Sequence, residues 1–323
     1  MTISSQPLSL VAKPTSDTEL IRIAEVKLRR AGVIGKLPTP VDELLACNGV
    51  DEIADPEAAK DQFLATLGDY ARKRFLAAWQ KVRGIADLRE RVVYVPHTTI
   101  LPRVLFAKSH EFGHQVIPWH DNLVYRDDDR TLKRDVEEVF EREANFFASE
   151  VIFQGARFMR RALDYRPSLE AVFSLADLHG ASRQATLWRF VESHDEPIAV
   201  VFYVPSRYAV DFENLPIFRI PRLVGSPAFI KRFGGIELPA EIWTGHPWVD
   251  ARASSQICCG NIRLECGAGP VSFTWEAWWN TYSLLIILRR LPSLSFVGRM
   301  IYGERSDQRL SGERGLWTPR RSC

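Results

Sequence analysis

The sequence predicts an α+β fold in which a helix-rich N-terminal part is followed by a C-terminal part of mixed α/β character. Up to about residue 193, apolar residues recur at the three- and four-residue spacing of amphipathic helices. The first of these helices are expected over about Thr18–Arg30, Val41–Cys47 and Pro56–Val82. From Pro197 onward, short apolar runs and strict alternation take their place, most clearly over residues 271–279. With a turn at Asn280-Thr281 and the apolar run at Tyr282–Leu288, this segment predicts a β-hairpin. With 323 residues, 46% of them hydrophobic, the chain is long enough to build a core in each part.

The segment from His110 to His114 reads His-Glu-Phe-Gly-His and is flanked by prolines that predict the two ends of a helix. Helical side chains four positions apart share a face, so both imidazoles can bind one zinc ion. Glu111 is then placed to take a proton from water during attack on a peptide carbonyl. Gly113 costs about 1 kcal/mol relative to alanine inside a helix, which a closely approaching backbone would explain. The alternative is a core helix with two buried, hydrogen-bonded histidines.

A second helix is predicted after the acidic run at residues 127–129. Glu141 and Asn145 lie one turn apart beside its apolar stripe, where the small Ala144 permits close approach of another helix. We therefore expect Glu141 to be the third zinc ligand. Asn145 is expected to orient a ligand histidine through the ring nitrogen that does not touch metal. The alternative is that Glu141 and Glu143 are ordinary solvated residues.

Residues 110–114 and 141–148, the latter reading Glu-Arg-Glu-Ala-Asn-Phe-Phe-Ala, together resemble the ImmA/IrrE family of zinc metallopeptidases. That family carries HExGH followed by an ExxAN-x-FA block. The Glu-x-x-x-Asn spacing is also similar to the Glu-x-x-x-Asp of gluzincin peptidases. This spacing favours Glu141 over Glu138 or Glu143 as the third ligand.

The resemblance is strong over about residues 20–155 and thin beyond about residue 195. It implies a gluzincin-like metallopeptidase domain with one zinc ion per chain. The studied members are intracellular and cleave helix-turn-helix repressors to switch on stress or mobile-element genes, so a repressor of that kind is the expected substrate. The insertion at residues 118–120 and the long C-terminal half depart from the family pattern.

The expected mechanism makes Glu111 the general base and later the proton donor to the leaving amine. A second electrophile is needed for the oxyanion, and His97, His120 and Tyr125 are the candidates that lie close along the chain. The apolar run at residues 91–95 predicts a strand just before the histidine helix. In gluzincin-type peptidases such a strand forms the edge on which an extended substrate adds.

Residues 169–178 and 182–191 predict two helices joined by a short turn, which is a helix-turn-helix shape. Arg183 and Arg189 would lie in the second helix. Two arginines do not make a DNA-binding surface, so we expect packing or substrate docking, with direct DNA contact as the less favoured reading. The nine tryptophans, several of them between residues 243 and 279, are expected to be core rather than the pocket of a sensor domain.

Composition excludes other classes of protein. Lys and Arg (42) nearly balance Asp and Glu (40), so no strong field for a polyanion is implied. The five cysteines lack the paired spacing of a zinc ribbon. The first 16 residues lack the apolar core of a signal peptide, and the longest apolar run is too short to span a bilayer. These features favour a cytoplasmic protein without membrane contact.

The sequence therefore favours a site-specific zinc peptidase. A DNA-binding transcriptional regulator with a vestigial peptidase core is the alternative, and the intact Glu111 argues against it. A structural zinc site would normally have four ligands rich in cysteine. The expected organisation is a disordered N-terminus (1–16), a metallopeptidase domain (17–157), a helix-turn-helix-like segment (158–196), a mixed α/β domain (197–303), for which a GAF-like sensor is one reading, and a disordered basic tail (304–323).

Overall fold

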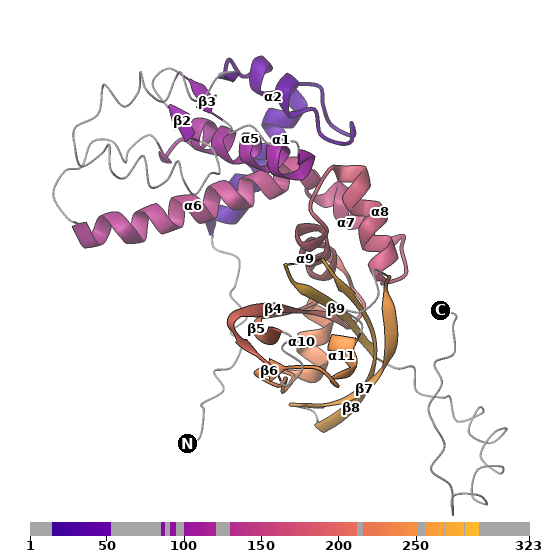
Figure 1. Ribbon diagram of the computed structural model, residues 1–323. Coiled ribbons are helices and arrows are strands. Elements are labelled where there is room, and N and C mark those ends of the chain that lie inside the picture. The colour runs from indigo at the N-terminus through magenta and orange to yellow at the C-terminus, as the bar shows by residue number, and fades with distance from the viewer. Residues whose placement is uncertain are drawn as a thin grey trace, which may run out of the picture. The chain divides into compact units, whose positions relative to one another are not determined.

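The computed structural model describes residues 15–52, 85–87, 91–94, 100–120, 130–211, 216–250, 256–267, 269–280 and 282–290. His97, Tyr125, the acidic run at 127–129, the helix expected at 56–82 and the C-terminal tail lie outside the described residues. The chain divides into two compact units, Met1–Arg166 with Glu170–His194, and Pro167–Leu169 with Asp195–Cys323. Both helices and strands are present, as the predicted α+β class requires (Figure 1).

The first unit is built mainly of helices (Figure 1). Most of them were predicted from apolar spacing, and α2 has the predicted bounds. The helix α7 and the strands β1 and β2 were not predicted. The elements are α1 (Thr15–Arg30), α2 (Val41–Cys47), β1 (Asp51–Glu52), β2 (Ile85–Asp87), β3 (Val92–Tyr94), α5 (Leu101–Val116), α6 (Arg130–Phe153), α7 (Ala156–Leu163), α8 (Leu169–His179) and α9 (Arg183–Ser193).

The helix α5 carries the HExxH segment and lies along α6 (Figure 1). It begins after the extended residue Ile100, with a proline in its first turn, and ends at the extended residue Ile117, whose N–H donates to the Gly113 carbonyl at 3.0 Å. Every residue from Ala107 to Gly113 is buried. The burial extends around the helix because α6, α2 and the small sheet all contact it.

Gly113 lets α5 and α6 approach closely. A Cβ atom at this position would lie 3.1 Å from Cδ1 of Phe147 and 3.5 Å from Cα of Ala144. The rings of Phe112 and Phe147 pack beside it, with 5.8 Å between centroids, and both are fully buried. The close backbone approach expected from the glycine is therefore present, and it brings the two helices of the predicted site together.

The three-stranded sheet has the order β1-β3-β2. The central strand β3 pairs in parallel with β1, where Asp51 faces Val92, and antiparallel with β2, where Ile85 faces Tyr94. The strand predicted at residues 91–95 exists, but its predicted role as the open edge for substrate is wrong, because both of its sides are paired. The short β2 gave no apolar pattern that could reveal this pairing.

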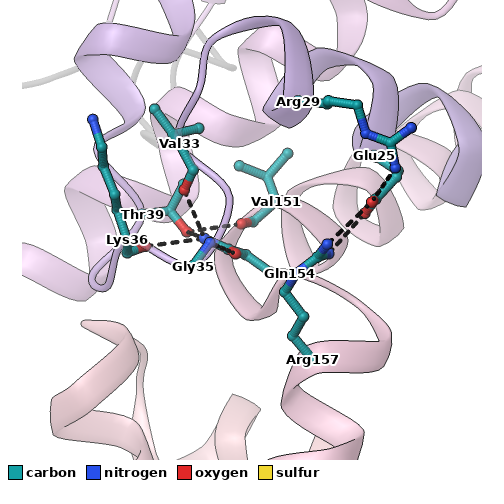
Figure 2. A network of polar contacts seen from close by, with 9 residues as sticks. All are labelled: Glu25, Arg29, Val33, Gly35, Lys36, Thr39, Val151, Gln154 and Arg157. Atoms are coloured by element: carbon teal, nitrogen blue, oxygen red, sulfur yellow. Dashed lines mark hydrogen bonds and ion pairs between the residues drawn. The ribbon is translucent and has the colours of Figure 1, made fainter.

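The side chain of Gln154, at the end of α6, fixes the loop between α1 and α2 (Figure 2). Its Oε1 accepts from the Gly35 N–H at 2.7 Å, and its Nε2 donates to the Lys36 carbonyl at 3.0 Å and to the Thr39 hydroxyl oxygen at 3.1 Å. The Thr39 hydroxyl in turn donates to the Val151 carbonyl at 3.0 Å. Because buried polar groups are costly when unpaired, this network sets the loop against the end of α6.

Two ion pairs tie the later helices of the first unit to the earlier ones. Arg157 of α7 contacts Glu25 of α1 at 2.9 Å (Figure 2). Arg189 of α9 contacts Glu150 of α6 at 2.5 Å, and the Glu150 side chain is buried. The helices α7 to α9 thus belong to the first unit, which ends at His194.

The second unit holds a six-stranded sheet of order β6-β5-β4-β9-β8-β7 in which all neighbouring strands are antiparallel. The predicted hairpin is present, with Trp279 of β8 facing Leu284 of β9, and Oδ1 of Asn280 accepting from the Ser283 N–H at 2.7 Å. The elements are β4 (Ile198–Val210), β5 (Pro216–Gly225), α10 (Pro227–Phe233), β6 (Glu241–Ile242), α11 (Pro247–Asp250), β7 (Cys258–Cys266), β8 (Gly269–Trp279) and β9 (Leu284–Arg290).

The tryptophans of the second unit are divided between core and surface. Trp248 and Trp275 are buried members of its hydrophobic core, as predicted. Trp243 is half exposed, so the core prediction is wrong for this residue. Across the described parts of the chain, no helix is both long enough and apolar enough to cross a membrane.

Candidate metal centre

Three side chains from α5 and α6 converge on one point. His110 and His114 stand one turn apart on α5, with 3.2 Å between their Nε2 atoms. Glu141 of α6 reaches both, at 3.5 Å from Nε2 of His110 and 3.6 Å from Nε2 of His114. The three donor atoms lie within 4.8 Å of one another. This is the trio that the sequence predicted as zinc ligands.

The chemistry of this donor set fits a metal ion. The Nδ1 atom of His110 lies 3.1 Å from Oδ1 of Asn145, as predicted. An amide oxygen only accepts, so Nδ1 carries a proton, and in the neutral ring the lone pair is on Nε2, where a metal ion can take it. Two imidazole nitrogens and one carboxylate are a usual protein ligand set for catalytic zinc, in which one coordination position stays open for reactants.

Glu111 lies beside the donor cluster without belonging to it. Its carboxylate is 4.0 Å from Nε2 of His110, and the residue is only 4% exposed. A carboxylate one position after a ligand histidine points off the row that faces the metal. This placement suits a group that acts on water rather than on the ion.

The charges of the cluster keep its carboxylate ionised. Hydrogen bonds from His110 and His114 hold the pKa of Glu141 well below its usual range, against the opposing effect of burial. Burial lowers the pKa of His110, but the hydrogen bond with Glu141 and the charges of Glu111 and Glu141 outweigh it, so that the pKa of His110 is raised. The ionised carboxylate is the form that binds a metal.

His120 lies on the outer side of His114. Its Nδ1 is 3.0 Å from Nδ1 of His114, its Nε2 is 3.1 Å from Oε2 of Glu143, and its ring stacks on Phe140 at 4.2 Å. Burial, with the charge of His114, lowers its pKa to about 4, although Glu143 opposes the shift. Both ring nitrogens of His120 thus have partners, His114 and Glu143, and its expected role at the oxyanion stays a prediction. The other two candidates, His97 and Tyr125, lie outside the described residues.

Glu143 is the site residue that the sequence analysis missed. It is 4% exposed, and its Oε2 also accepts from the indole N–H of Trp119 at 2.6 Å. Its partners come from the insertion after α5, which a turn brings back over the helix, with the His120 N–H donating to the Ile117 carbonyl at 3.1 Å. One signal was available, because Glu143 lies one turn before the core residue Phe147, where a solvated carboxylate is out of place.

The fold and the site together define an α+β domain in which an HExxH helix packs against a helix that carries a third, acidic donor. Residues 68–190 match the family model Peptidase_M78, the IrrE N-terminal-like domain, and this match supports an assignment of this part of the chain to the ImmA/IrrE family. Among solved structures, a Mycobacterium tuberculosis transcriptional regulator is similar, with 15% identity, a TM-score of 0.48, and coverage of 84% of this chain and 75% of the other. None of the curated proteins compared with the chain matches it.

Proposed function

We propose that the chain is a zinc-dependent peptidase, with His110, His114 and Glu141 holding the ion. The convergence of their three donor atoms within 4.8 Å is the observation that carries the proposal. The match of residues 68–190 to a peptidase family supports it. When bound, zinc supplies Lewis acidity that polarises the carbonyl of the scissile peptide bond.

The protein's own residues supply the proton transfers and the orientation. Glu111 accepts a proton from the attacking water and passes it to the leaving amine, which is general acid–base catalysis by one carboxylate. The buried position of Glu111 excludes bulk water from that transfer. Asn145 holds the ring of His110 by its Nδ1–H, so that this ligand needs no reorientation.

The proposed substrate is an extended segment of a helix-turn-helix repressor in the cytoplasm. An extended peptide can add to an unpaired strand edge through its main chain. Since β3 is paired on both sides, the edge assigned to the substrate moves to β2, which pairs with β3 and contacts α5. This arrangement would keep the gluzincin-like relation between an edge strand and the HExxH helix.

A DNA-binding regulator with a vestigial peptidase core is the second candidate, since α8 and α9 are joined by a three-residue turn. The arginines of α9 argue against it. Arg189 is paired with the buried Glu150, and the guanidinium of Arg183 lies 4.2 Å from the ring centroid of Phe173. Both cations make contacts within the protein, which supports packing over phosphate binding.

The test is a Glu111→Gln variant compared with the wild type on a panel of helix-turn-helix repressors. We expect the variant to bind zinc as the wild type does, because Glu111 is no ligand, and to cleave more slowly by a factor of about 10²–10⁴. Zinc content is measured by metal analysis and cleavage by mass spectrometry of the products. Near-normal turnover in the variant would overturn the mechanism. A wild type that binds operator DNA and cleaves no repressor would favour the second candidate.

A further inference from the structure

The two histidines of α5, His110 and His114, differ in the hydrogen-bond partner of their Nδ1 atoms. His110 meets an amide oxygen of Asn145, which can only accept a proton. His114 meets a second imidazole, that of His120, with 3.0 Å between the two Nδ1 atoms. An imidazole nitrogen can donate or accept, so this contact alone leaves the tautomer of His114 open.

Glu143 removes the ambiguity at His120. Its Oε2 accepts from the indole N–H of Trp119 at 2.6 Å and lies 3.1 Å from Nε2 of His120. A carboxylate oxygen only accepts, as this one does from the indole N–H, so Nε2 of His120 carries the proton of the bond between them. In a neutral His120 the lone pair is then on Nδ1, facing His114.

The tautomer of His120 in turn determines the tautomer of His114. Because Nδ1 of His120 accepts, Nδ1 of His114 donates, and the lone pair of His114 is left on Nε2. That atom lies 3.2 Å from Nε2 of His110 and 3.6 Å from Oε1 of Glu141, inside the cluster. Both α5 histidines therefore direct an Nε2 lone pair at the same point. The tautomer of His110 is fixed by the amide of Asn145. The tautomer of His114 is fixed by His120 and Glu143, and we call this pair of side chains the relay.

We propose that Glu143 and His120 are positioning residues of the metal centre, which fix His114 in the tautomer that carries its proton on Nδ1. The inference rests on the proposed function. His120 contacts His114 on the side away from the donor atoms, Glu143 contacts His120, and both side chains are buried, at 6% exposure for Glu143 and 1% for His120. The ring of His120 is also held by stacking on Phe140 at an interplanar angle of 11°, which fixes the direction of its Nδ1.

The first measurement is the zinc affinity of the full chain by competition with a chelator. The His120→Phe variant keeps a ring to stack on Phe140 but removes both nitrogens, and we expect zinc to bind about 10–100-fold more weakly. In His120→Asn, an oxygen bonded to Cγ replaces Nδ1, and we expect part of the affinity to return. Unchanged affinity in His120→Phe, or no recovery in His120→Asn, would overturn the proposal, because a residue that only filled space would give those results.

The second measurement needs neither zinc nor a variant. The ¹⁵N chemical shifts of the histidine rings in the zinc-free wild type, recorded under conditions in which His114 is neutral, distinguish a proton on Nδ1 from one on Nε2. We expect Nδ1–H in His114 and Nε2–H in His120. The opposite tautomer in either ring would overturn the relay, even if His120→Phe failed to fold.

A failure of the proposal can be told apart from a failure of the proposed function. If the wild type binds zinc, Glu141→Ala abolishes binding and His120→Phe changes nothing, the metal centre stands and the relay is wrong. If the wild type binds no zinc while the ¹⁵N shifts show the expected tautomers, the relay exists but the peptidase function is wrong.

Discussion

At the scale of single residues, α6 directs three neighbouring polar side chains to different partners. These residues are Glu141, Glu143 and Asn145. Glu141 and Asn145 are four positions apart and face α5, where they meet the donor cluster and His110 respectively. Glu143, two positions from each, points to another side, since residues two apart on a helix diverge by about 200°. It reaches His114 only through His120, which comes from the chain after α5.

The third ligand gives the first prediction at this scale. Glu141→Ala removes the only carboxylate of the trio, so we expect zinc binding to fall below detection in metal analysis after dialysis. Glu138→Ala, an exposed glutamate one turn earlier, is the matched control and should bind zinc like the wild type. Glu143 is unsuitable as a control because it is buried with His120. Equal zinc content in the two variants would contradict the assignment of Glu141.

The buried His179 predicts how stability depends on pH. Burial lowers its pKa, helped by the charge of Arg161 and opposed by the hydrogen bond with the Ile152 carbonyl at 3.2 Å. The folded state therefore resists protonation, whereas the unfolded chain takes up a proton below about pH 6.5. The stability associated with a neutral His179 is thus present above that pH and is lost as the pH falls below it toward the folded-state pKa.

The check compares urea unfolding of zinc-free wild type and His179→Gln at pH 7.5 and pH 5.0. Glutamine can still donate to the Ile152 carbonyl but does not titrate. We expect the wild type to lose more free energy of unfolding between the two pH values than the variant does. An equal loss in both proteins would mean that His179 is not a source of acid sensitivity.

Much of the donor trio could be predicted from the sequence, because helical spacing places residues on faces without knowledge of the tertiary fold. The shared face of His110 and His114, and that of Glu141 and Asn145, follow from four-residue intervals. The choice of Glu141 over Glu138 and Glu143 came from the resemblance to the gluzincin Glu-x-x-x-Asp pattern. The role of His120 could not be predicted in this way. It depends on a turn after Ile117 that returns the chain over α5, which no local pattern specifies.

At the scale of elements, the predictable ones have strong periodicity or clear ends. The β8–β9 hairpin follows from alternation over residues 271–279 and the turn at Asn280, and α2 follows from the helical pattern over residues 41–47. The strand β2 has three residues, Ile85–Asp87, and exists through pairing with β3 rather than through its own pattern. Missing it led to the wrong edge for the substrate.

The packing of α5 on α6 gives a prediction for Gly113. Alanine at this position would favour the helix by about 1 kcal/mol, but its Cβ would lie 3.1 Å from the ring of Phe147. That ring is fully buried against Phe112 and has little room to yield. We expect Gly113→Ala to lower stability by about 1–3 kcal/mol and to weaken zinc binding, because Glu141 moves away from the histidines with α6.

Urea unfolding of the zinc-free protein and chelator competition measure the two effects. The double variant Gly113→Ala with Phe147→Leu makes room for the new methyl group. It should recover zinc affinity relative to the single variant, although the smaller side chain has its own cost in stability. Wild-type zinc affinity in Gly113→Ala would show that the approach of the helices at this point does not control the site.

At the scale of the whole molecule, the proposed chemistry lies entirely in the first unit. This unit contains the donor trio and Glu111. It also contains the outer partners of the ligand histidines, which are Asn145 beside His110, His120 beside His114, and Glu143 beside His120. Among the described residues of both units, the trio is the only cluster of histidine, cysteine or acidic side chains with metal-ligand spacing. The first unit ends at His194, two residues before the boundary expected from composition, and the subdivision into named domains stays a prediction.

The last prediction follows from this division. A fragment of residues 1–194 should bind one zinc ion with the affinity of the full chain, because it keeps all three ligands and their outer partners. It loses the hydrogen bond that Arg289 donates to the Pro167 carbonyl and the one that the Leu169 N–H donates to the Glu276 carboxylate, so we expect easier proteolysis at residues 167–169. We expect it to cleave the repressor poorly or without control. Loss of zinc by the fragment would show that the first unit does not bind zinc on its own. Unchanged cleavage of the repressor would show that the second unit is not needed for efficient, controlled cleavage.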